Sequence, residues 1–163
     1  DTSESLGAKL NNKMVGTFGD INVTSIRSEK MIGVGEGAVI STKNKKIFEN
    51  ISLLASRSAP FRKSTDPYWK KYYVVGEGYN YLMPHLLGSV ARAQIERFNT
   101  VLLKKKISVG KNYFRILKKN NLAFGQKLIK NSKPVFWLNS VLFNKNSKKE
   151  VRKIGEMLKK KGY

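Results

Sequence analysis

Alternating apolar and polar residues predict two strands near the start of the chain. The segment 21–26, Ile-Asn-Val-Thr-Ser-Ile, begins as an alternation, and 37–41, Gly-Ala-Val-Ile-Ser, contains a β-branched run. The connection between them is rich in glycine over 33–37, which permits positive φ and close approach of the backbone. Such a connection can present the hydroxyl of Ser25 and the amine of Lys30 to one small anionic ligand.

Helical spacing of apolar residues predicts the next elements. The segment 44–57 has this spacing and begins with an asparagine that can act as its N-cap. A longer helix over 84–117 starts at Pro84, which needs no amide hydrogen in a first turn, and we expect it to bend near Gly110. Residues 58–82 show no clear period and predict a long loop.

Weaker patterns occur at both ends of the chain. Residues 2–8 predict a short helix, and the apolar run within 134–143 predicts a strand. A last helix follows, with Ser147 as its cap. Together these elements predict a mixed α/β chain.

The net charge of +21 would suit a protein that binds nucleic acid or a membrane surface, since lysines that neutralise phosphates release counterions. The lysines, however, form short clusters spread through helical stretches, and such clusters are usually the solvated face of a helix. We therefore expect no nucleic-acid or membrane partner. A basic nucleic-acid-binding module is the alternative, and its binding would depend steeply on salt.

Composition excludes several other classes of site. The absence of cysteine excludes disulfides and thiolate metal sites, and His85 is the only histidine, so we expect no metal site. No apolar run approaches the ~20 residues of a membrane helix, and no signal peptide is visible. These features predict a soluble, cytoplasmic protein.

Two interpretations of the connection around Lys30 need comparison. Most lysines are solvated surface residues, although partial burial favours the neutral form of an amine, which can attack a carbonyl. Spacing alone does not distinguish Lys30 from the other lysines.

The run at 33–38 fits the dinucleotide fingerprint G-x-G-x-x-A, but that motif must open a helix, and here a strand follows. We therefore reject a dinucleotide site.

Several blocks of the sequence, taken together, resemble one enzyme family. They are Asp-Thr-Ser-Glu-Ser-Leu-Gly-Ala at 1–8, Val-Gly-Thr-Phe-Gly-Asp-Ile at 15–21, the stretch 25–38, Gly-Tyr-Asn-Tyr-Leu-Met at 78–83 and Ala-Gln-Ile-Glu-Arg at 93–97. In this order they resemble the DegT/StrS family of sugar aminotransferases. The members are pyridoxal-phosphate enzymes with the aspartate-aminotransferase fold, and they aminate keto sugars that are attached to a nucleotide.

The resemblance implies roles for individual residues in a cofactor site. Lys30 matches the lysine that forms a Schiff base with pyridoxal phosphate and later moves a proton, and Asp1 matches the aspartate that pairs with the pyridinium nitrogen. Ser25 matches a serine that binds the cofactor phosphate. Glu4 lies where the family has Glu or Gln close to the cofactor. Asn80 matches an asparagine that reaches the phosphate of the neighbouring subunit's cofactor, which implies a homodimer.

Some positions depart from the family pattern. Ile26 replaces an aromatic residue, Leu82 replaces an arginine, and Ala38 replaces the last glycine of the glycine-rich turn. None of these changes removes a residue that the resemblance assigns to the reaction. Leu82, however, cannot make the orienting contacts of the arginine that it replaces. Family members are much longer and supply a phosphate-binding helix end and a ring-stacking aromatic residue ahead of the position of Asp1. We therefore interpret the chain as an internal or C-terminal fragment.

The resemblance also implies an architecture and a function. Residues 1–100 would form the C-terminal part of the cofactor-binding large domain of fold type I, and residues 101–163 would form part of the α/β small domain. The implied reaction is amination of a nucleotide-linked keto sugar, with glutamate as amino donor. We expect the chain alone to be inactive, because half of the pocket would be missing. The alternative is a non-aminating family member, but the dehydratases replace the lysine and Lys30 argues against them.

Overall fold

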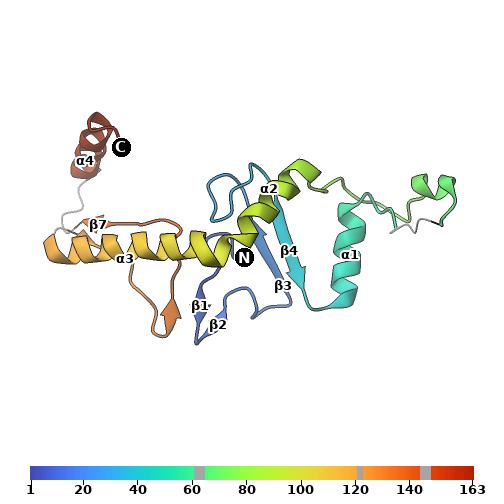
Figure 1. Cartoon of the computed structure of the whole chain (residues 1–163), viewed down its shortest axis with the longest axis horizontal. Coiled ribbons are helices and arrows are strands. Elements are labelled where there is room, and N and C mark those ends of the chain that lie inside the picture. Colours follow the sequence, from blue (N-terminus) through green and yellow to red (C-terminus); the bar gives the residue numbers. More distant parts are fainter. Residues whose placement is uncertain (61–64, 121–122, 144–147) are drawn as a thin grey trace.

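The computed structural model describes residues 1–60, 65–120, 123–143 and 148–163. Figure 1 shows an elongated, mixed α/β molecule in which the β3–β4 hairpin lies near the centre and α3 extends to one side. The elements in chain order are β1 (Lys9–Leu10), β2 (Lys13–Met14), β3 (Ile21–Ser25), β4 (Ala38–Thr42), α1 (Lys45–Ala55), η1 (Tyr68–Tyr72), α2 (His85–Glu96), η2 (Phe98–Leu102), α3 (Leu103–Asn120), β5 (Ala123–Phe124), β6 (Ser132–Lys133), β7 (Leu142–Phe143) and α4 (Lys148–Lys160).

The central hairpin pairs β3 with β4 in antiparallel register, from Ile21 opposite Thr42 to Ser25 opposite Ala38. Both strands were predicted from the sequence, and both are confirmed. The N-terminal residues lie beside β3, because the Thr2 amide donates to the carbonyl of Val23 at 2.8 Å. The first residues of the chain are therefore fixed next to the end of the strand that leads to Lys30.

A second, smaller sheet joins distant parts of the chain. β1 pairs with β2 on one side and with β6 on the other, both antiparallel, so that Lys9 lies opposite Met14 and Lys133. The predicted helix over 2–8 is instead a series of turns. The segment after β6 therefore returns to the N-terminal residues and contributes to the same region of the structure.

The predicted strand over 134–143 is wrong for most of its length, since only β7 is extended and paired. Phe136 has a positive φ of 56°, which interrupts a strand. Its ring is buried against α3 at Gly110, and it makes an edge-to-face contact with Phe114 at 5.4 Å between ring centroids. Burial of this aromatic ring has determined the local backbone in place of strand pairing.

The helices largely follow the predicted pattern. Asn44 caps α1, and its side-chain oxygen accepts from the amide of Ile47 at 3.2 Å. α2 begins directly after Pro84 and continues through the π-helical turn η2 into α3. The predicted bend at Gly110 is wrong: Figure 1 shows α3 continuing straight, and the irregularity is at η2. α4 is present as predicted, whereas its expected cap, Ser147, lies outside the described residues.

The hydrophobic core lies where the β3–β4 connection meets α2 and the segment after β6. Its buried side chains come from these parts, from the residue before β1 and from η2, namely Ala8, Ile26, Met31, Ile32, Val34, Ala91, Phe98 and Val135. The division of the chain at residue 100 falls within η2, and it stays a prediction. Within the described ranges, no helix combines the length and the hydropathy that a membrane span requires.

Gly110 offers a test of the packing between α3 and the segment after β6. A Cβ atom at Gly110 would overlap the ring of Phe136, so Gly110→Ala is expected to lower the free energy of unfolding by about 1–3 kcal/mol, despite the better helix propensity of alanine. Gly88→Ala is the matched control in α2, because a Cβ there meets nothing within 4 Å. It should raise stability by about 0.5–1 kcal/mol. Urea unfolding followed by circular dichroism measures both, and equal effects would contradict the packing.

Candidate functional site

The connection between β3 and β4 is anchored by the burial of its own apolar side chains. Ile26, Met31, Ile32 and Val34 are all buried, and Ile26 is only 1% exposed. Backbone hydrogen bonds fold the connection back on itself, since Ile26 donates to Gly37 at 2.9 Å and Val34 donates to Ile26 at 3.0 Å. The residues between these anchors, including Lys30, are therefore held in a defined loop.

Contacts with α2 hold the same loop from the other side. The side-chain amide of Gln94 donates to the carbonyl of Gly33. Gly33 lies so close to the carbonyl oxygen of Ser28 that no Cβ could be accommodated there. The glycine is thus required for the fold of the loop, and Gln94 connects the loop to the helix.

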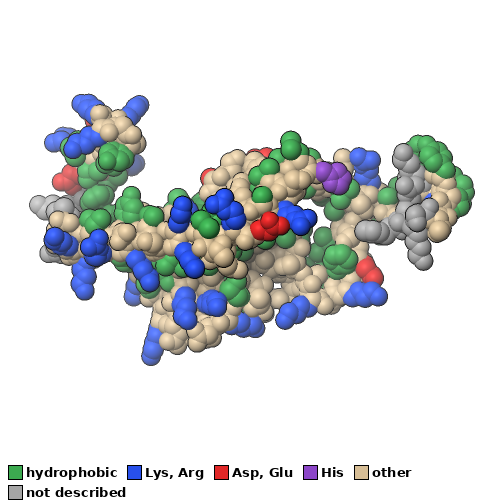
Figure 2. Space-filling view, in the orientation of Figure 1, with side chains coloured by type: hydrophobic (Ala, Val, Ile, Leu, Met, Phe, Trp, Pro, Cys, Tyr) green, Lys and Arg blue, Asp and Glu red, His purple; other side chains and the backbone are tan. Residues whose placement is uncertain are grey.

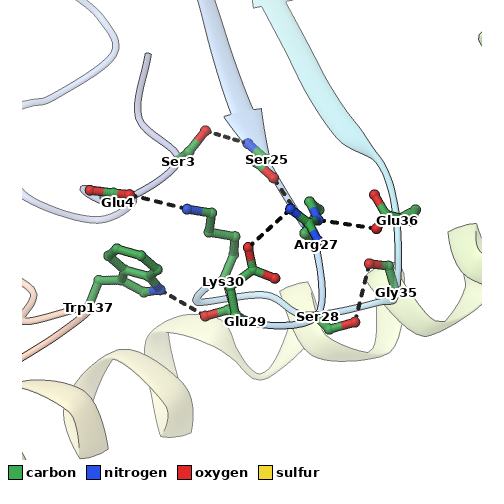
Figure 3. A network of polar contacts seen from close by, with 10 residues as sticks. All are labelled: Ser3, Glu4, Ser25, Arg27, Ser28, Glu29, Lys30, Gly35, Glu36 and Trp137. Atoms are coloured by element: carbon green, nitrogen blue, oxygen red, sulfur yellow. Dashed lines mark hydrogen bonds and ion pairs between the residues drawn. The ribbon is translucent and has the colours of Figure 1, made fainter.

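Lys30 projects from this loop into a largely enclosed position. Its side chain is 12% exposed, and its Nζ lies 3.3 Å from Oε1 of Glu4. The same Nζ lies 4.0 Å from the centroid of the Trp137 ring. Figure 3 shows the amine pointing toward the carboxylate of Glu4, with the indole of Trp137 close by. The carboxylate and the aromatic face are both groups that attract a cationic side chain.

A buried pair of hydroxyl groups holds the N-terminal segment beside β3, close to Lys30. Thr2 is 2% exposed, and its Oγ1 lies 2.6 Å from Oγ1 of Thr24 on β3. On either side of Thr2, Oδ1 of Asp1 accepts from the amide of Ser3 at 2.7 Å, and Oγ of Ser3 accepts from the amide of Ser25 at 2.8 Å. These bonds fix Asp1 and its neighbours beside the end of β3.

A cavity of about 480 Å³ opens where these segments meet. Four of the residues predicted to bind a cofactor lie around it: Asp1, Glu4, Ser25 and Lys30. The remaining lining residues are Ser3, Ser5, Arg27 and Glu29. The structure thus brings together side chains that are up to 29 positions apart in the sequence. The cavity combines cations, hydroxyl groups and carboxylates, which suits a ligand that carries both an anionic group and a basic nitrogen.

Asn80 does not line this cavity. It forms a β-bridge with Ser56 after the end of α1, in the segment that leads to α2. Its predicted role, contact with the cofactor of a neighbouring subunit, does not require it to lie near Lys30 of its own chain. That role stays a prediction.

Sequence reasoning did not identify two residues that contribute to this region. Arg27 lines the cavity, and its guanidinium lies 3.1 Å from Oε1 of Glu36 and 3.7 Å from Oε1 of Glu29. Its position in the sequence, between Ser25 and Lys30, could have indicated that it belongs to the site. Trp137 lies more than a hundred residues after Lys30, and no local pattern connects the two. Among the residues that the structure describes, no group of three or more histidines or carboxylates is placed to hold a metal ion.

Comparison with known proteins gives this geometry a context. The model of the DegT/DnrJ/EryC1/StrS aminotransferase family matches residues 1–163. The chain belongs to this family. GDP-perosamine synthase of Escherichia coli O157:H7 is 31% identical over 145 residues, which cover 87% of this chain and 36% of the relative. The family member described here therefore spans about a third of the length of this relative.

Solved structures of aminotransferase-family proteins share the fold of this DegT/StrS chain. PseC of Helicobacter pylori, an aminotransferase of pseudaminic acid biosynthesis, superposes with a TM-score of 0.83 at 24% identity, covering 99% of this chain and 42% of PseC. The E. coli GDP-4-keto-6-deoxy-D-mannose-3-dehydratase with bound hydrated PLP gives 0.73 at 22% identity, covering 91% and 40%. These likenesses confirm the predicted fold, a partial α/β aminotransferase of fold type I.

Gln94 provides a test of how the Lys30 loop is held. Gln94→Leu removes the hydrogen bond to Gly33 and leaves a partly buried carbonyl without this donor, so the free energy of unfolding should fall by about 1–2 kcal/mol. Hydrogen exchange of the amides at 26–37 should increase. Arg92→Ala, which removes an exposed ion pair with Glu96 from the same helix, is the control and should change stability by less than about 0.5 kcal/mol. Unchanged exchange in Gln94→Leu would contradict the anchoring role.

Proposed function

We propose that this chain is part of a pyridoxal-phosphate-dependent aminotransferase that acts on a nucleotide-linked keto sugar. The observation that carries the proposal is the position of Lys30. It is a largely enclosed amine on a cavity that Asp1, Glu4 and Ser25 also line. These are the residues to which the family resemblance assigns the cofactor, and family membership supports the reaction class.

The residues around the cavity fit this cofactor in their chemistry. Lys30 would hold it through its amine, Ser25 would donate to its phosphate, and Asp1 would pair with its pyridine nitrogen. Arg27 and the hydroxyl groups of Ser3 and Ser5 add further partners for an anionic group on the same cavity. When bound, pyridoxal phosphate supplies an electron sink for the carbon that loses a proton.

Lys30 is also placed to act as a general acid and base. Its Nζ lies on the cavity, within 3.3 Å of Oε1 of Glu4, so it would be within reach of a proton on a ligand bound there. Glu4 itself is exposed at its outer side, with 62% of its side-chain surface accessible. Glu4 would orient the amine, and Lys30 would move the proton.

The relatives suggest the substrate class. The relatives include GDP-perosamine synthase and, from H. pylori, UDP-4-amino-4,6-dideoxy-N-acetyl-beta-L-altrosamine transaminase. Both names contain a sugar linked to a nucleoside diphosphate. We extend this class to the present chain and take glutamate as its amino donor, in keeping with the family. A non-aminating role like that of the E. coli dehydratase is disfavoured by Lys30.

Reductive trapping tests the assignment of Lys30. The chain is incubated with pyridoxal phosphate, reduced with borohydride, digested and mapped by mass spectrometry. Label should concentrate on the peptide that contains Lys30, since this amine lies beside groups that bind the cofactor. Lys30→Arg, which keeps the charge, is the control and should lose the selective label. Labelling spread evenly over the many lysines, with Lys30 no different from the rest, would count against the proposal.

We further propose that the protein acts as a homodimer. Large apolar side chains are exposed on the segment from η1 to the start of α2, among them Tyr68, Trp69, Tyr72, Tyr81, Leu82 and Leu86. Exposed apolar surface of this kind marks interaction sites in many proteins. Asn80 lies within the same segment, where contact with a second copy would carry it toward the partner's cavity.

Sedimentation velocity tests the dimer. The chain should sediment as a dimer at micromolar concentration, and Leu86→Lys should shift it toward the monomer because burial of a lysine in an apolar contact is costly. Leu138→Lys, the same substitution at another exposed leucine on the segment after β6, is the control and should leave the dimer intact. A wild-type chain that stays monomeric at all concentrations would contradict a dimer formed by these residues.

A further inference from the structure

The contact between Trp137 and Lys30 joins two distant segments at the centre of the candidate site. The indole Nε1 of Trp137 donates to the carbonyl of Glu29 at 2.8 Å, while its ring lies 4.0 Å from Nζ of the next residue, Lys30. One side chain thus binds the backbone at one position and the side-chain amine at the following position. Figure 3 shows the indole of Trp137 next to Glu29 and the side chain of Lys30.

The placement of Trp137 follows from the packing of Phe136. The positive φ of Phe136 directs its own ring onto Gly110 of α3, and the following residue is thereby turned toward the Lys30 loop. Nζ of Lys106, also on α3, donates to the carbonyl of Trp137 at 3.3 Å. The backbone of Trp137 is therefore tied to α3, and its indole is tied to the Glu29 carbonyl, through bonds that do not involve the side chain of Lys30.

Of the two partners of Lys30, the ring is the better placed to confine the amine. Glu4 is mostly exposed, and exposed ion pairs contribute little because water and salt screen them. An aromatic face against a largely dehydrated ammonium is a stronger contact, and it also excludes water. Trp137 in addition lines a neighbouring cavity of about 300 Å³, so loss of the ring would open Lys30 to that cavity.

We propose that Trp137 is a positioning residue whose indole face holds Nζ of Lys30 at the cavity and shields it from solvent. The functional meaning of this contact rests on the proposed function, because it concerns the same lysine. The contact itself does not depend on any cofactor. It can therefore be measured separately from cofactor binding.

Competitive acetylation tests the shielding. The full chain is trace-labelled with acetic anhydride, and the modification of each lysine is quantified by peptide mass spectrometry. Trp137→Leu should raise the reactivity of Lys30 about three- to tenfold relative to Lys45 on the exposed face of α1. Trp137→Phe keeps an aromatic face and should raise it less. Trp69→Leu, which removes an exposed tryptophan from η1, is the matched control and should leave Lys30 unchanged.

Nuclear magnetic resonance of the wild-type chain keeps the proposal testable if Trp137→Leu does not fold. Protons above an aromatic face are shifted upfield, so the Cε protons of Lys30 should resonate upfield of those of the other lysines. Wild-type Lys30 reactivity in both Trp137 variants, or an unshifted Lys30 resonance, would overturn the proposal. If the acetylation and resonance results hold while reductive trapping fails to select Lys30, the proposed function is contradicted and the positioning contact stands.

Discussion

The burial of the residues around Lys30 is the constraint on which the rest of the site depends. An ammonium group is strongly hydrated, and removing most of that water is unfavourable unless other interactions compensate. Here the compensation begins with the neighbours of Lys30 in the sequence. Met31, Ile32 and Val34 enter the core, and their burial fixes the loop from which Lys30 projects. The position of the lysine is thus set by apolar packing and refined by the polar contacts around it.

The buried hydroxyl pair of Thr2 and Thr24 is the second element that the cavity requires. It acts together with the bonds from the Thr2 amide to Val23 and from the Ser25 amide to Ser3, which also hold the N-terminal residues beside β3. A buried hydroxyl without a partner is costly, so the two groups satisfy each other and align the backbones that carry them. Asp1 and Glu4 then follow at fixed positions on either side of Thr2. With the N-terminal segment held there, Glu4 lies 3.3 Å from the amine of Lys30 and Asp1 lines the same cavity.

Sequence patterns predicted those parts of the fold that depend on neighbouring residues. β3, β4 and α1 follow from alternation, helical spacing and the Asn44 cap, all of which act over a few positions. The segment 134–143 was predicted to hold a strand, and only β7 at its end is one, while Phe136 is buried against Gly110 by a contact with a distant part of the chain. For the same reason no local pattern indicated Trp137. The connection between two predicted strands already grouped Ser25 with Lys30, but Asp1 and Glu4 could be added only through the family resemblance, since periodicity carries no information about which distant segments meet.

The charge distribution can be interpreted in the light of this site. Of the 32 lysines and arginines, 19 lie after Glu96, where Glu150 and Glu156 are the only acidic residues. Figure 2 shows Lys and Arg side chains distributed along the length of the visible face, without one concentrated stripe. A diffuse positive potential of this kind attracts anions of any shape, and salt screens it over about 10 Å at 0.1 M. Selection among anions must therefore come from the cavity, where carboxylates near Lys30 and Arg27 offset part of their positive charge. The position and the hydrogen bonds of the ligand then decide which anion binds. The net charge of +21 is consequently compatible with a small phosphorylated ligand, and it does not by itself require a polymeric one.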